Sequence, residues 1–243
     1  MKNNKKLLLL QVREGETAQN EYDSILLFGD ISADMIEVVH IKTHELHSLD
    51  MLDYSAVIVG GGPLDVSTLL SQKSPHQLSV EHTLKKYIQQ IYENDIPFLG
   101  LCYGLGILVD TLGGTVSRDY GEAVGPVELS LTTSGQKDEL FAGCDGTDAL
   151  VGHHEGVATL PVGAVLLAHS PDCPVQAMRI KNNIYGTQFH PELDAYGLAV
   201  RLDAYRHHGY FSPEEYDDIV NMAKNADLSR SHLVLHRFCK KYC

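Results

Sequence analysis

A cysteine stands at a predicted junction between a buried strand and a helix, with a glycine two positions before it and another two positions after it. The stretch reads PFLGLCYGLG, with a strand expected over 98–101, Cys102 at the corner and a helix over 103–112. This G-x-C-x-G pattern is the cysteine form of the nucleophile elbow. Glycine suits such a turn because a Cβ would meet neighbouring backbone. The helix N-terminus should favour the thiolate. The pattern predicts a nucleophile, and the alternative is an inert buried cysteine beside a structural turn.

A histidine and a carboxylate follow another predicted strand, over 184–189, in the order His190-Pro191-Glu192. Positions i and i+2 of an extended chain project to the same side, and proline stiffens the link between them. A carboxylate beside an imidazole selects its tautomer and stabilises the imidazolium. Alone, the segment would be better interpreted as a surface turn. Paired with an elbow cysteine, it predicts a general base.

Three glycines, Gly60 to Gly62, follow a third apolar run over 56–59. A phosphate-binding loop would need G-K-[ST] downstream, and Leu64-Asp65-Val66 stands there instead. The dinucleotide fingerprint G-x-G-x-x-G is also absent. Backbone N–H groups aimed at a developing oxyanion are the better use of this loop. A plain structural turn remains the alternative.

Short apolar runs alternate with helical patterns along the chain, which predicts an α/β fold with a mainly parallel central sheet and helices on both faces. Helices are expected around Val80–Ile91, over 103–112, after the cap Ser212-Pro213, and from about Ser231 towards Cys243. We interpret residues 1–243 as a single domain with loop-rich insertions. The expected strands are 7–12, 35–41, 56–59, 98–101, 127–131, 165–169, 177–180 and 184–189.

The amino-acid composition argues against several classes of binding partner and location. The net charge of −13 argues against nucleic acid and against an anionic membrane surface, both of which require Lys and Arg. The apolar run 7–10 is shorter than a secretory or membrane-spanning segment needs. Five cysteines without CxxC spacing suggest a reducing cytoplasm. Thirteen histidines lack metal-ligand spacing, so no metal is predicted, and His207-His208 should cap a helix end.

Taken together and in this order, "GGGP", "GLCYG" and "TQFHPE" resemble the signature stretches of the class I glutamine amidotransferases, which use a Cys-His-Glu triad. The similarity looks strongest to free-standing proteins like the amidotransferase domain of GMP synthase. It extends from about Tyr54 to Tyr210 and includes "GEAVGPVELSL" and "SPDCPVQAM". The resemblance implies a flavodoxin-like fold and no cofactor.

The resemblance also implies roles for individual residues. Cys102 would be the nucleophile, with His190 as general base and acid and Glu192 orienting it. The backbone N–H groups of Gly62 and Tyr103 would form the oxyanion hole. The implied reaction is hydrolysis of the side-chain amide of glutamine through a cysteine thioester. The ammonia would pass to a synthetase subunit.

Substrate contacts are expected from Gly61, Gly106, His153 and His154. Two of these positions depart from the family pattern: Gly106 stands where many members have a glutamine, and "VGHHEGV" stands where related chains often read "HGDEV". A changed pocket leaves two other hypotheses open. One is hydrolysis of another γ-glutamyl amide or peptide by the same triad. The other is a regulatory module whose triad is dormant.

Overall fold

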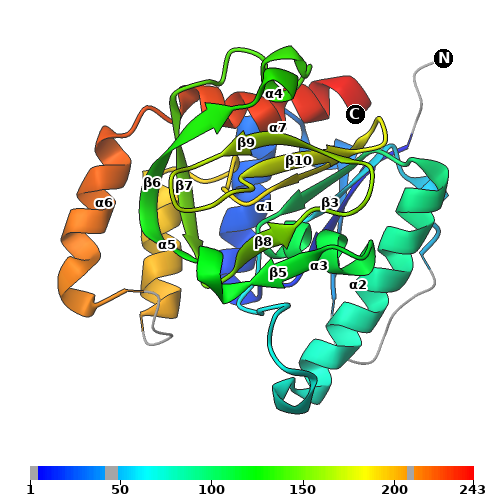
Figure 1. Cartoon of the computed structure of the whole chain (residues 1–243), viewed down its shortest axis with the longest axis horizontal. Coiled ribbons are helices and arrows are strands. Elements are labelled where there is room, and N and C mark those ends of the chain that lie inside the picture. The colour runs from blue at the N-terminus through cyan, green and yellow to red at the C-terminus, as the bar shows by residue number, and fades with distance from the viewer. Residues whose placement is uncertain (1–4, 42–48, 207–210) are drawn as a thin grey trace.

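The computed structural model describes residues 5–41, 49–206 and 211–243, and within them a nine-stranded sheet is flanked by helices (Figure 1). The strand order is β2-β1-β3-β4-β11-β10-β9-β6-β7. The strands of this sheet are β1 (Leu7–Gln11), β2 (Ile36–His40), β3 (Ala56–Val59), β4 (Phe98–Leu101), β6 (Glu122–Leu131), β7 (Thr147–His153), β9 (Ala164–His169), β10 (Ala177–Ile180) and β11 (Ile184–Thr187).

Half of the sheet is parallel and carries the motifs. Strands β2, β1, β3, β4 and β11 pair in parallel, and the runs in β1, β3, β4 and β11 are buried throughout. Strands covered on both faces are continuously apolar, which is why they were predictable. The carboxyl ends of β1, β3, β4 and β11 therefore meet along one edge, where open α/β sheets bind ligands.

The other half is antiparallel. Strands β10, β9, β6 and β7 extend the sheet beyond β11, and β7 forms its edge. The strand predicted over 127–131 is half exposed, as expected. It is the end of the longer strand β6, which lies next to the edge strand β7. A separate hairpin pairs β5 (Thr115–Ser117) with β8 (Gly156–Thr159).

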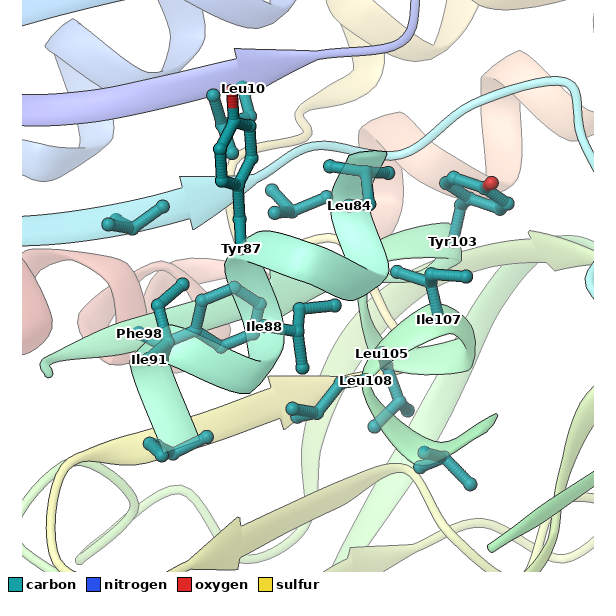
Figure 2. Close-up of a cluster of buried hydrophobic side chains, with 14 of the residues drawn as sticks. Leu10, Leu84, Tyr87, Ile88, Ile91, Phe98, Tyr103, Leu105, Ile107 and Leu108 are labelled. Atoms are coloured by element: carbon teal, nitrogen blue, oxygen red, sulfur yellow. The ribbon is translucent and has the colours of Figure 1, made fainter. Parts of the chain in front are cut away.

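Helices cover both faces of the sheet. Helices α1 and α7 pack against each other on one face, and α2 and α3 pack together on the other, while α5 contacts both α1 and α6 (Figure 1). Leu84, Tyr87 and Ile88 of α2 meet Ile107 and Leu108 of α3 in one buried cluster (Figure 2). The helices are α1 (Gly15–Gly29), α2 (Pro75–Asn94), α3 (Tyr103–Thr111), α4 (Thr133–Lys137), α5 (Ala195–Tyr205), α6 (Tyr216–Asn225) and α7 (Ser229–Tyr242).

The predicted α/β class, with a parallel sheet at its centre and helices on both faces, is confirmed. The cap at Ser212 begins a single turn of 3₁₀-helix, and α6 starts three residues later than the pattern suggested. The predictions missed α1, α4, α5, β5, β7 and β8. His207-His208 lies outside the described residues. In the described part of the chain, every helix is too short or too polar to cross a membrane.

Close packing between α3 and the sheet depends on Gly104. A Cβ at this position would lie 2.4 Å from the carbonyl oxygen of Val59 in β3. We expect Gly104→Ala to lower the free energy of unfolding by about 1–3 kcal/mol, because a packed core cannot accommodate the extra methyl. Gly106→Ala on the same helix is the matched control: its nearest neighbour, a methyl of Val66, would be 3.3 Å away. Equal urea midpoints for the two variants would contradict the prediction.

Candidate active site

The backbone of Cys102 has the strained geometry of a nucleophile elbow. Between β4 and α3 its φ is 50° and its ψ is −97°, a region that non-glycine residues rarely occupy. Strain of this kind costs on the order of 1–3 kcal/mol and persists only where the surroundings impose it. The Cys102 N–H donates to Thr187 O at 2.7 Å, and a Cβ on Gly100 would lie 2.5 Å from Gly104 O. The glycines are thus needed for the turn, as predicted.

The Cys102 thiol is held in its protonated form. Burial raises its pKa to about 12, and the positive charge of Arg13 opposes that rise without cancelling it. The Nε2 group of Gln188 donates to Sγ at 3.6 Å. The expectation of a resting thiolate was therefore wrong, because desolvation outweighs the helix N-terminus. Such a thiol requires a base at the moment of attack.

His190 and Glu192 form the predicted pair, and an arginine that was not predicted completes it. Nδ1 of His190 lies 2.8 Å from Oε1 of Glu192, which also accepts from Nη2 of Arg201 at 2.9 Å. Nη1 of Arg201 lies 3.1 Å from the same ring nitrogen. An ionised carboxylate only accepts, so the shorter contact to Glu192 requires a proton on Nδ1, and Arg201 then donates to the carboxylate and not to the ring. Nε2 is then the ring's proton acceptor.

Burial and the neighbouring charges set the protonation of this pair. Burial lowers the pKa of His190 to about 4; Glu192 opposes that change, and Arg201 adds to it. The pKa of Glu192 is lowered despite full burial, because His190 and Arg201 both stabilise the carboxylate. At neutral pH the imidazole is therefore neutral beside an ionised carboxylate. Such an imidazole can accept a proton and readily gives it up again.

A second buried ion pair fixes the glycine loop. Nε of Arg13 lies 3.3 Å from Oε1 of Glu21, and that oxygen accepts the Gly61 N–H at 3.1 Å. A Cβ on Gly61 would lie 2.6 Å from Nη2 of Arg13 and 2.9 Å from Cε1 of His190. The Gly61 amide, predicted to contact substrate, is thus directed at Glu21. The next residue, Gly62, lies beside Cys102.

Two cavities meet at Cys102 and Gly62. The first, here called the His190 cavity, contains His190, Arg13 and Arg201 and has a volume of about 50 Å³. The second, here called the Glu155 cavity, contains Gly106, Gln188 and the stretch 152–155, with a volume of about 20 Å³. Both predicted substrate histidines line the second cavity, as does Tyr103.

Glu155 holds the wall of its cavity in place. Its two carboxylate oxygens accept the Val66 and Ser67 N–H groups at 2.7 and 2.8 Å. Gly106 contributes no side chain here; a Cβ would lie 3.3 Å from Val66 and 3.7 Å from Glu155 Oε1. Burial raises the pKa of Glu155. The half-exposed His154 lies 3.7 Å from a carboxylate oxygen of Asp65.

His153 is buried, and both of its ring nitrogens have hydrogen-bond partners within the protein. Its Nδ1 lies 2.8 Å from Glu155 O, and its Nε2 lies 2.8 Å from Oε2 of Glu122. Cys173 completes with His153 and Glu122 a buried group whose ligand atoms lie within 4.8 Å of one another. In the described residues this group is the one with a composition suited to a metal ion. A hydrogen bond already joins His153 to Glu122, and the Cys173 thiol donates to Val175 O at 3.6 Å.

Sequence reasoning missed Arg13, Glu21, Arg201, Glu155 and Gln188. A signal existed for Arg13, since a charged residue directly after a buried strand lies at the edge where ligands bind. Gln188 lies within the "TQFHPE" stretch. Glu21 and Arg201 are buried polar residues of α1 and α5, and only the packing of those helices shows their partners.

The chain matches known proteins along much of its length. Residues 32–200 match the family described as "Glutamine amidotransferase class-I". The "GMP synthase [glutamine-hydrolyzing]" of Ectopseudomonas mendocina is 34% identical over 163 residues, which are 61% of this chain and 29% of that protein. The protein of the same name from Streptococcus thermophilus is 40% identical over 114 residues, 43% of this chain and 20% of that protein.

Solved structures share the fold. A glutamine amidotransferase from Methylobacillus flagellatus has a TM-score of 0.76 at 18% identity, covering 98% of this chain and 96% of its own. A glutamine amidotransferase from Thermotoga maritima has a TM-score of 0.74 at 20% identity, covering 97% and 98%. At these identities the likeness concerns the fold alone.

Replacement of Arg201 should change the titration of His190. In Arg201→Gln the positive charge beside Nδ1 is lost and Glu192 loses one counter-ion, so we expect the pKa of His190 to rise from about 4 towards its ordinary value by about one pH unit or more. The measurement is NMR titration of the His190 Cε1–H signal. Arg206→Gln, which removes an exposed arginine paired with Asp203, is the control and should leave the signal unchanged. An unshifted titration in Arg201→Gln would contradict the prediction.

Proposed function

Because the chain belongs to the class I glutamine amidotransferase family, we propose that it hydrolyses the side-chain amide of glutamine and releases ammonia. The observation that carries the proposal is local: a cysteine with elbow geometry shares a cavity with an imidazole that a buried carboxylate orients. A neutral thiol and a neutral imidazole are the reactants that general-base activation of a nucleophile requires.

The first half of the proposed reaction forms a thioester. Nε2 of His190 accepts the thiol proton as Sγ of Cys102 attacks the amide carbon, and Glu192 stabilises the imidazolium. The oxygen of the tetrahedral intermediate accepts hydrogen bonds from the N–H groups of Gly62 and Tyr103. As the C–N bond breaks, His190 returns its proton to the nitrogen, and ammonia leaves.

The second half regenerates the enzyme. His190 removes a proton from a water molecule, which attacks the thioester carbon on the side that the amine has vacated. The C–S bond breaks, glutamate is released and the thiol recovers its proton. Arg201 supports both halves by holding Glu192, so that the orientation of the imidazole is maintained through the proton transfers.

The partner and setting of this reaction are also proposals. The chain spans 20–29% of the length of the two GMP synthases described above, and the proposed ammonia acceptor is a synthetase of that kind. The five cysteines are unpaired, in keeping with a cytoplasmic location. We treat residues 1–243 as one amidotransferase domain whose substrate contacts include Gly106, His153 and His154 lining the Glu155 cavity.

A second candidate function is hydrolysis of other γ-glutamyl amides by the same residues. The observation that favours it is the cavity on the His190 side of the thiol, which aliphatic side chains border in part. With glutamine as the substrate, the leaving group on that side is ammonia alone.

Cys102→Ala should abolish glutamate release from glutamine, with a loss of about 10⁴-fold or more, because no other group can form the thioester. A glutamine-mimicking electrophile should add to Cys102 in the unmodified protein, as read by mass spectrometry of peptides. Cys243→Ser, which removes an exposed thiol, is the control and should retain both activity and labelling. Equal labelling of Cys102 and Cys243 would instead support a dormant regulatory module.

A further inference from the structure

The chemistry of the proposed reaction assigns a role to each cavity beside Cys102. The group that protonates the departing nitrogen must lie on the leaving-group side of the sulfur. His190 lines one of the two cavities and is not among the residues that line the other. The amine must therefore depart into the His190 cavity, while the glutamyl chain lies towards the Glu155 cavity.

The His190 cavity is larger than ammonia requires. A cavity of roughly 10–15 Å³ holds one water molecule, which is similar in size to ammonia. The His190 cavity measures about 50 Å³. On the leaving-group side there is thus space beyond what ammonia occupies.

One part of the wall of this space, opposite the charged groups, is apolar. Val124 and Val151 from the antiparallel half of the sheet face Leu193 and the α5 residues Leu198 and Leu202. Most of these side chains belong to one buried hydrophobic cluster. Apolar walls contribute nothing to holding ammonia, whereas each buried CH₂ of a bound ligand contributes about 0.8 kcal/mol.

The charges around the cavity are balanced. Arg13 is paired with Glu21, and Arg201 is paired with Glu192. Each guanidinium group in the lining thus already has a carboxylate partner behind it. A neutral group fits this cavity better than a carboxylate does.

We propose that the preferred substrates are γ-glutamyl amides whose nitrogen carries a small, uncharged apolar group, and that this group occupies the His190 cavity. This proposal rests on the proposed cysteine amide-hydrolase function and names its substrate class. The step is the same one: Sγ bonds to the amide carbon, the C–N bond breaks, and His190 donates its proton to the nitrogen. A primary alkylamine leaves in place of ammonia. Water then cleaves the thioester to glutamate and the free thiol.

The test compares kcat/KM for glutamine, γ-glutamyl-ethylamide and γ-glutamylglycine with the full chain. We expect the ethylamide to exceed glutamine by about 10-fold or more, since each methylene in an apolar pocket is worth about that factor. We also expect it to exceed γ-glutamylglycine, which carries a carboxylate. If glutamine is the best of the three, the inference is overturned while the proposed function stands. If γ-glutamylglycine is best, the neutral occupant is overturned. No turnover of any substrate and no labelling of Cys102 would overturn both proposals.

Substitutions of Val124 test whether the group on the amide nitrogen occupies the His190 cavity. Val124 is half-buried, so Val124→Phe can fill the cavity without disrupting the core, and it should lower the ethylamide-to-glutamine ratio of kcat/KM by about 10-fold. Val124→Ala should raise the isobutylamide-to-ethylamide ratio, because it enlarges the same space. Met222→Phe, at an exposed position of α6 outside the cavity, is the matched control and should leave both ratios unchanged. Ratios unaffected by either Val124 substitution would overturn the assignment of the cavity.

Discussion

Glu192 is a completely buried carboxylate, and the rest of the site follows from the need to neutralise it. An unpaired charge in a protein interior costs several kcal/mol, so a buried carboxylate must have cationic or strongly donating neighbours. Arg201 supplies the cation from α5, and the imidazole of His190 supplies the N–H. The orientation of the proposed general base is thus a consequence of charge burial. It does not depend on a flexible surface contact.

Pairing Glu192 with Arg201 places a positive charge in the interior, and that charge needs neutralising neighbours of its own. Arg201 brings a second cation into the interior, where burial and the neighbouring charge of Arg13 lower its pKa, so an anion is needed nearby. Glu21 from α1 meets that need and at the same time accepts the Gly61 N–H. Through these contacts β1, α1, α5 and the glycine loop are held in one arrangement around the thiol. A single charge removed from this set would leave a partner unpaired, so we infer that its members act together.

The features that could be predicted from the sequence are those that depend on residues close together in the chain. The strand–cysteine–helix corner, the His190–Glu192 pair and the buried parallel strands are each carried by contiguous residues, and the structure has all three. Helix α1 was missed because Asn20, Glu21 and Ser24 interrupt its apolar face with polar residues that are buried. Arg201 was missed because it lies in α5, and its partner Glu192 lies nine residues earlier in the loop before that helix. The protonation of Cys102 was mispredicted because burial, a tertiary property, outweighs the effect of the adjacent helix end.

The departure from the family pattern at Gly106 has a structural counterpart in Glu155. Where many members place a glutamine side chain, this chain leaves space bordered by Val66 and the Glu155 carboxylate. That carboxylate is itself held by two backbone N–H groups of the loop opposite, so the wall is fixed from the 152–155 side. In place of a glutamine side chain on α3, this chain has a clamp: the Glu155 carboxylate, which joins the 152–155 stretch to the loop that carries Val66 and Ser67. The position of the clamp, beside Cys102 and away from His190, leaves selection of the leaving group to the other cavity. On the proposal made above, the acyl chain and the amine are thus recognised on opposite sides of the sulfur.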